Sequence, residues 1–343
     1  MTRRRTVLLA ATAAAATVAL SACGSSLEAT GDLDSAKLTI YSAQHKNLTE
    51  EWGKEFQDKT GIQVQVRYGN DSSMGSQIVQ EGASSPADVF LTENSPAMTT
   101  VQKAGLLAPV EAATLGQVGP QYVPSSKDWV GIAARSTVLV YNPSKISESQ
   151  LPASLMDLTK PEFNGKWGAA AGGADFQAIV SAVLATQGEA KTSEWLAGLK
   201  SGAKIYQNNI ATMKAVNSGQ SAMGVIYHYY WYRDQALDKE SSGNTKLHYF
   251  KNEDPGAFVS LSGGGVLKSS KHAADAQKFL AFVTSKEGQK VLGTTDAKEY
   301  AVGTGVASDP ALPPLDSLQA PKIDPFTLNG PKVIELMTKA GLL

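Results

Sequence analysis

The stretch KLTIYSAQHKNLTEEWGKEFQDKTGIQVQVRY, residues 37–68, decides the fold class of this chain. Residues 38–41 predict a short strand. Apolar side chains then recur every four residues from Leu48 to Phe56, which is typical of an amphipathic helix. Residues 62–68 alternate between apolar and polar side chains, as a half-buried strand does. The order strand, helix, strand indicates an α/β protein.

The same alternation continues along the chain. Further strands are expected at residues 87–91, 129–141, 223–227 and 258–267. Further helices are expected at residues 77–81, 96–104, 177–186, 193–199, 209–217 and 274–292. Residues 309–325 are rich in proline and are expected to wrap over the surface. This order favours an α/β fold with a mostly parallel sheet, helices on both faces, and two lobes linked by extended crossings.

Composition and charge exclude several classes of protein. The chain has 343 residues, 42% of them hydrophobic, and 31 Lys and Arg against 32 Asp and Glu. This length suits two ordinary domains or one large one, and the hydrophobic content argues against a disordered chain. There is no basic excess to neutralise a phosphate backbone, so a nucleic acid is not an expected partner.

The N-terminus has the order of a secretory signal. Arginines at residues 3–5 precede an apolar, alanine-rich run at residues 7–20 that is too short to span a membrane comfortably. The run leads into Leu-Ser-Ala-Cys, which resembles the lipidation motif of bacterial lipoproteins and contains Cys23, the only cysteine. We therefore expect a signal peptide at residues 1–22, export by the general or the twin-arginine route, and a flexible tether at residues 23–36. A lipid on Cys23 would anchor the protein to the cell membrane, on the outer surface or in the periplasm.

Open α/β sheets bind their ligands at the carboxyl ends of the strands. Three expected strand ends carry unusual side chains. Gln44 and His45 follow the first strand, Glu93 and Asn94 follow the third, and the run YHYYWY occupies residues 227–232. These residues are the candidates for a binding site.

The run at residues 227–232 contains four of the eleven tyrosines. Such a run is typical of an aromatic core or of a platform on which a sugar stacks. It also suits a pair of phenolate ligands for a hard, highly charged metal ion. Tyrosine titrates at about 10 in water, so a phenolate at neutral pH needs a strong nearby positive charge, such as a trivalent iron. On these residues alone both interpretations stay open.

A set of short motifs along residues 37–309 carries a family resemblance. The motifs are YSAQHK at residues 41–46, PADVF at 86–90 with Glu93, AGLLAP at 104–109, YYW at 229–231, DPGA at 254–257, VLKSS at 266–270 and KEGQ at 286–289. In this order they resemble the ferric-binding-protein family, the iron(III)-binding components of bacterial ABC importers. The resemblance implies a two-lobed periplasmic-binding-protein fold of type II, with a ligand cleft between lobes joined by extended crossover strands.

The resemblance also implies a function and a ligand set. The chain is expected to capture iron(III) and deliver it to an ABC permease driven by its ATPase. The family's iron ligands, carried over by position, are His45, Glu93, Tyr229 and Tyr230. Two positions of an octahedron remain for a small anion or water, and closure of the lobes would complete the site. The expected lobes are residues 37–137 with 260–310 and residues 138–259 with 311–343.

The positions that hold a companion anion in the family differ in part. Gly172, Gly173 and Ala174 stand where many members have Ser-Gly-Ala, and Asp175 adds a negative charge beside them. The helix that follows still offers backbone N–H groups to an anion. The other expected contacts, by the same resemblance, are Asn94, Arg135, Asn209 and Tyr227. The missing hydroxyl and the added charge weaken the case for phosphate, and carbonate, or water with Tyr227, fits equally well.

Two other functions fit parts of the sequence. Related binding proteins hold organic cations such as thiamine or polyamines by cation–π attraction, which Tyr229, Tyr230 and Trp231 with Glu93 would suit. A secreted enzyme is disfavoured, because the chain has no Gly-x-Ser-x-Gly, His-Glu-x-x-His or Walker-type motif. We expect a monomeric binding protein, not an enzyme. The remaining conspicuous histidines are expected to be structural: His228, His248 and His272.

Overall fold

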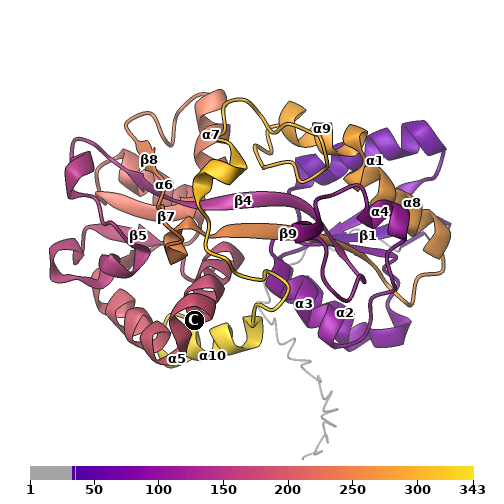
Figure 1. Ribbon diagram of the computed structural model, residues 1–343, viewed down its shortest axis with the longest axis horizontal. Helices are drawn as coiled ribbons and strands as arrows, with labels where there is room; N and C mark the ends of the chain where they lie inside the picture. Colours follow the sequence, from indigo (N-terminus) through magenta and orange to yellow (C-terminus); the bar gives the residue numbers. More distant parts are fainter. Residues whose placement is uncertain (1–32, 35) are drawn as a thin grey trace, which may run out of the picture. The chain divides into compact units, whose positions relative to one another are not determined.

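The computed structural model describes residues 33–34 and 36–343 (Figure 1). The expected signal peptide, the lipidation site Cys23 and most of the expected tether lie outside these described residues. None of the helices in the described part of the chain has the length and apolar character that crossing a bilayer needs.

One nine-stranded sheet organises the described residues (Figure 1). Its strands are β1 (Leu38–Ser42), β2 (Val64–Tyr68), β3 (Val89–Leu91), β4 (Val130–Tyr141), β5 (Trp167–Ala169), β6 (Ala203–Ile205), β7 (Met223–Tyr227), β8 (Lys246–His248) and β9 (Val259–Val266). The strand order is β2-β1-β3-β9-β4-β7-β5-β6, and β8 pairs with β4.

The sheet is mixed, so the expectation of a mostly parallel sheet is wrong at its centre. β1 runs parallel to β2 and β3, and β5 runs parallel to β6 and β7. In contrast, β9 is antiparallel to β3 and β4, and β4 is antiparallel to β7 and β8. The difference arises because β4 and β9 cross between the two parallel groups in opposite directions.

Helices cover both faces of the sheet. They are α1 (Lys46–Thr60), α2 (Asp71–Glu81), α3 (Ser95–Lys103), α4 (Ala112–Leu115), α5 (Ala174–Gly202), α6 (Asn209–Asn217), α7 (His228–Ala236), α8 (Ala273–Thr284), α9 (Lys286–Thr294) and α10 (Gly330–Lys339). Figure 1 shows two layered halves with β4 and β9 running between them. We call the half with β1–β3, α1–α4, α8 and α9 the N-lobe, and the half with β5–β8, α5–α7 and α10 the C-lobe. The residue boundaries expected for the lobes stay a prediction.

The expected elements agree closely with the observed ones where the pattern was strong. The helix expected at 209–217 and the strand expected at 223–227 have those same bounds. The two helices expected at 177–186 and 193–199 are parts of α5, which is broken at Gly188, where φ is 76°. Strands β5, β6 and β8 and helices α4, α7 and α10 were not foreseen.

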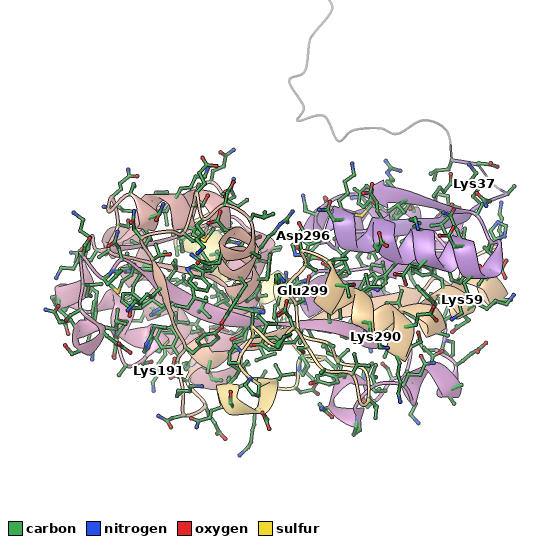
Figure 2. The ribbon with its side chains drawn as sticks, turned by 90° about the horizontal axis from the view of Figure 1, so that it is seen from above. Lys37, Lys59, Lys191, Lys290, Asp296 and Glu299 are labelled. Carbon is green, nitrogen blue, oxygen red and sulfur yellow. The ribbon has the colours of Figure 1, made fainter. Side chains whose placement is uncertain are left out.

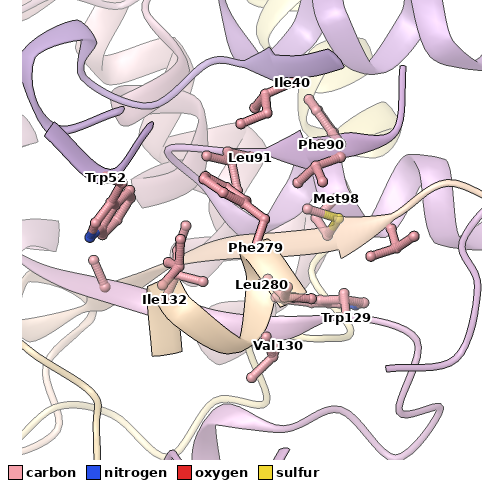
Figure 3. Packing of buried hydrophobic residues seen from close by; sticks show 14 of the residues in the cluster. Ile40, Trp52, Phe90, Leu91, Met98, Trp129, Val130, Ile132, Phe279 and Leu280 are labelled. Atoms are coloured by element: carbon pink, nitrogen blue, oxygen red, sulfur yellow. The ribbon is translucent and has the colours of Figure 1, made fainter. Parts of the chain in front are cut away.

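The N-lobe core shows why residues 37–68 adopt their fold. Leu48, Trp52 and Phe56 form the buried face of α1, which ends at Gly61 in the left-handed conformation that glycine tolerates. The indole nitrogen of Trp52 donates to the carbonyl oxygen of Gly288 at 2.7 Å, which ties α1 to α9. Figure 3 shows Trp52 among side chains from β3, β4, α3 and α8.

This packing predicts a large loss of stability for Trp52→Ala. The substitution empties a fully buried position and removes the hydrogen bond to Gly288, so we expect a loss of about 3–5 kcal/mol in the free energy of unfolding. Urea unfolding followed by circular dichroism measures it. Val79→Ala on α2, where the side chain is 39% exposed, is the control and should change stability by less than about 1 kcal/mol. Equal losses in the two variants would contradict the role given to Trp52.

Candidate metal centre

Three strands end at one place between the lobes, and the residues after them carry the expected ligands. His45 follows β1 as the N-cap of α1, and Glu93 follows β3. Tyr229 and Tyr230 lie in the first turn of α7, which begins directly after β7. The sheet therefore brings together side chains that are far apart in the sequence.

His45 connects the N-lobe part of this group. Its Nε2 lies 3.4 Å from Oε1 of Glu93 and 3.3 Å from Oε1 of Glu299. Burial, together with the positive charges of Arg135 and Arg233, lowers the pKa of His45 well below its ordinary value. The imidazole is therefore neutral, and its buried Nε2 makes no hydrogen bond within the described part of the chain. Such a nitrogen is suited to binding a metal ion.

The two phenols lie against each other and against one carboxylate. The rings of Tyr229 and Tyr230 have centroids 4.1 Å apart. Their hydroxyl groups donate to Oδ2 of Asp175 at 3.3 Å and 3.2 Å. Burial, and then the charge of Asp175, raises the pKa of both phenols well above the ordinary value. Both are therefore protonated until a stronger positive charge arrives, and a metal ion has to displace both protons.

Asp175 is the residue on which the two lobes converge. It is buried in the first turn of α5, where the helix dipole favours negative charge. Besides the two phenols, Nδ2 of Asn209 donates to its Oδ2 at 2.8 Å, and Nδ2 of Asn94 donates to its Oδ1 at 3.0 Å. Asn94 comes from the N-lobe and the other three donors from the C-lobe. A carboxylate of the chain thus takes hydrogen bonds from side chains expected to hold iron or its companion anion.

The other expected anion contacts are placed around this carboxylate. Gly172 precedes α5, Gly173 is the N-cap of the helix, and Ala174 is its first residue. The hydroxyl of Tyr227 donates to Oδ1 of Asn94 at 3.2 Å. The amide of Asn94 therefore links Tyr227 to the carboxylate.

Arg135 is fully buried in β4, and its guanidinium donates hydrogen bonds to several other residues. Its acidic partner, Glu299, is labelled in Figure 2. Nη1 of Arg135 donates to the backbone oxygen of Glu93 at 2.5 Å. Its Nη2 donates to Oε2 of Glu299 at 2.6 Å and to Oε1 of Gln44 at 3.2 Å. The guanidinium also lies over the ring of Tyr229, 5.4 Å from its centroid. The second oxygen of Glu299, Oε1, is buried and has no hydrogen-bond partner among the described residues.

Two acids of the site were not foreseen from the sequence, and a third, Asp175, was expected only as a negative charge that weakens anion binding. Asp71, the first residue of α2, accepts the backbone N–H groups of Glu93 and Asn94 at 2.9 Å each, and burial raises its pKa to about 7. Glu299 lies in an irregular segment after α9. Neither belongs to a pattern that marks a site. Asp175 did carry a signal, because it is an acid in the first turn of a helix expected to face an anion.

The three histidines expected to be structural have other surroundings. Nδ1 of His228 accepts the backbone N–H of Ser136 at 3.1 Å, and its ring stacks on that of Tyr300 with centroids 4.7 Å apart. Burial lowers the pKa of His228 to about 3. His248 lies in β8, and His272 is the N-cap of α8.

The donors gathered here suit a hard cation. Carboxylate oxygens, two phenols and one imidazole lie together, and such cations prefer oxygen ligands, while imidazole also suits iron. Within residues 33–34 and 36–343, no group of three or more His, Cys, Asp or Glu side chains is arranged to hold a metal ion. The candidate donor set instead combines acids and a histidine with the phenols of Tyr229 and Tyr230.

Two lobes joined by β4 and β9, with a polar site where they meet, define a substrate-binding protein of the two-lobed periplasmic type, type II. The chain belongs to the family of bacterial extracellular solute-binding proteins, whose profile matches residues 84–327.

Individual relatives support the same placement. The chain is 59% identical to an "Fe(3+)-binding periplasmic protein" of Serratia marcescens over 306 residues, covering 89% of this chain and 90% of the relative. It is 35% identical to the "Major ferric iron-binding protein" of Neisseria meningitidis serogroup B, covering 98% of each chain. The crystal structure of iron-bound HitA from Pseudomonas aeruginosa is similar with a TM-score of 0.84 and 45% identity, covering 89% of this chain and 99% of that one.

A contact between the lobes lies beside this site. Asp296, labelled in Figure 2 where the lobes meet, follows α9 of the N-lobe. Its Oδ2 lies 2.6 Å from Nη2 of Arg233 on α7. Both of its oxygens accept from Nδ2 of Asn47 on α1 at 3.3 Å. One carboxylate therefore connects the helix that follows His45 to the helix that carries the two phenols.

Asp296→Ala should shift the ligand-free protein towards more open arrangements. The side chains of Asp296 and Arg233 are each about one-third exposed. Their ion pair therefore stabilises the closed arrangement by at most about 1 kcal/mol, which is roughly a fivefold change in the closed-to-open ratio. Small-angle X-ray scattering of the ligand-free protein measures the shift as a larger radius of gyration. Asp275→Ala, which breaks an ion pair with Lys278 inside α8, should scatter like the unsubstituted protein. Identical scattering from both variants would show that Asp296 does not hold the lobes together.

Proposed function

We propose that this chain captures iron(III) between its lobes and delivers it to the permease of an ABC importer. The observation that carries the proposal is the convergence of Tyr229 and Tyr230 on Asp175, with the free Nε2 of His45 and the carboxylate of Glu93 beside them. The names of the Serratia and Neisseria relatives support the same cargo. Binding, not catalysis, is the role that these relatives' names describe.

The proposed ligands are His45, Glu93, Asp175, Tyr229 and Tyr230. Two phenolates and two carboxylates carry four negative charges, one more than a trivalent ion balances. Both phenol protons leave when the ion binds, so binding weakens as the pH falls. The ligands come from both lobes, so the ion draws the lobes together.

The proposed site needs no companion anion, which differs from what was expected from the sequence. We propose that the carboxylate of Asp175 takes the place of carbonate or phosphate, because Asn94, Asn209 and the two phenols already donate to it. Five ligands then come from the chain, and water fills the sixth position of an octahedron.

The alternative of an organic cation has less support. Cation–π binding needs an open aromatic face. The ring of Tyr229 is fully buried, has the guanidinium of Arg135 over it, and contacts the rings of His45 and Tyr230. A second cation on this ring would be repelled by Arg135.

The proposed setting follows from the same relatives and from the N-terminal sequence. A periplasmic or other extracytoplasmic location suits the relative from Serratia, which is named as periplasmic. A lipid on Cys23 would keep the protein at the membrane beside its permease and ATPase. We propose that it works there as a monomer.

Tyr229→Phe and Tyr230→Phe should each abolish or shift the visible absorption of the iron-loaded protein. Iron bound by phenolates absorbs visible light by charge transfer, and either substitution removes one phenolate. A visible spectrum with iron analysis of the protein from residue 24 onward measures the effect. Tyr232→Phe is the matched control, because its hydroxyl accepts from Tyr249 instead. A colourless unsubstituted protein that is stabilised by thiamine would overturn the iron assignment.

Asp175→Asn should make iron binding depend on an added anion. The substitution keeps the shape of the side chain and removes its charge. We expect iron affinity to fall at least about tenfold in an anion-poor buffer, a change of about 1.4 kcal/mol, and to recover in part with carbonate or phosphate. Competition with a soluble chelator measures it, and Asp234→Asn, whose carboxylate accepts from Ser241 and Ser242, is the control. If the unsubstituted protein already needs an anion, the role proposed for Asp175 is wrong.

A further inference from the structure

Glu299 is a buried acid that the proposed ligand set does not use. Its side chain has no exposed surface. One oxygen, Oε2, lies 2.6 Å from Nη2 of Arg135 and 3.5 Å from Nε2 of Gln44. The other, Oε1, lies 3.3 Å from Nε2 of His45 and has no hydrogen-bond partner in the described residues. Glu299 therefore places a negative charge between Arg135 and a proposed iron ligand.

Arg135 alone would be a strong attractor for an anion at this site. It is a fully buried guanidinium, its Nε has no partner among the described residues, and it lies over the ring of Tyr229. Guanidinium groups bind phosphate and carboxylate groups with two parallel hydrogen bonds. Beside a trivalent ion, such a group would hold an external anion on any open position of the ion.

We propose that Glu299 is a specificity-determining residue that neutralises Arg135 and so keeps external anions off the bound iron. Asp175 accepts hydrogen bonds from the neutral groups that would otherwise hold an anion, namely Asn94, Asn209 and the two phenols. Glu299 forms an ion pair with the cation, Arg135. Together the two carboxylates leave the sixth position of the ion to water. This inference rests on the proposed function, and it goes beyond it by assigning a role to a residue that does not bind the ion.

The test is the effect of inorganic phosphate on iron binding by Glu299→Gln. The amide keeps the size of the side chain and an acceptor for Arg135, but it leaves the charge of Arg135 unbalanced. Iron affinity, measured by competition with a chelator, should rise at least about tenfold when phosphate is added to this variant. The visible band should shift at the same time, because phosphate replaces the water on the ion.

Four comparison proteins make the test decisive. The unsubstituted protein and Glu287→Gln, which removes a surface acid paired with Lys59, should change less than about twofold with phosphate. Glu299→Asp, which keeps the charge, should behave like the unsubstituted protein. In the double variant Arg135→Gln with Glu299→Gln the cation is gone, so the phosphate effect should disappear. The double variant also removes a buried pair as a unit, which proteins tolerate better than the loss of one partner.

The outcomes separate this inference from the proposed function. If Glu299→Gln binds iron but ignores phosphate, the inference is overturned while iron binding stands. A phosphate effect that persists in the double variant, without Arg135, would also overturn the inference. If the unsubstituted protein binds no iron at all, it is the proposed function that fails.

Discussion

The site depends on how one buried cation, Arg135, is balanced against the carboxylates gathered around it. Glu93, Asp71 and Glu299 all have raised pKa values, and in each case burial is the largest cause. Charges removed from water are costly unless they are paired and hydrogen-bonded. Arg135 pairs with Glu299, and Asp71 accepts the backbone N–H groups of Glu93 and Asn94. The site is therefore short of positive charge until a cation enters, and the same cation joins ligands from both lobes.

The sheet explains why this balance responds to lobe movement. Arg135 lies on β4, one of the two strands that cross between the lobes, and its guanidinium contacts the segments after β1 and β3. The phenols reach the site from α7, which starts directly after β7 without an intervening loop. Asp175 connects the lobes through Asn94. Two crossing strands can bend as a hinge, while each group of ligands stays rigid on its own lobe.

Much of the fold could be predicted from the sequence, and so could several of the side chains that the structure brings together at the candidate site. The long amphipathic helix α1 and the continuously buried strand β7 were both expected close to their observed positions. Strands of three residues, such as β5 and β8, carry no periodicity, and the antiparallel centre depends on pairings that local patterns do not encode. The expected ligands follow strands, which makes them visible in a sequence. Glu299 follows a helix in an irregular segment, and only the folded chain brings it to Arg135.

The raised pKa values of the phenols bear on which ions such a site accepts. A phenol of ordinary pKa costs about 4 kcal/mol to deprotonate at pH 7, and the burial of Tyr229 and Tyr230 makes each one costlier. An ion that binds must offset the free-energy cost of deprotonating both phenols. A trivalent cation does so far more readily than a divalent one of similar size, because the electrostatic attraction scales with charge. The burial that selects for high charge also provides for release. When the lobes part, water reaches the phenols and carboxylates, the electrostatic attraction weakens, and protons compete with the ion for the same oxygens.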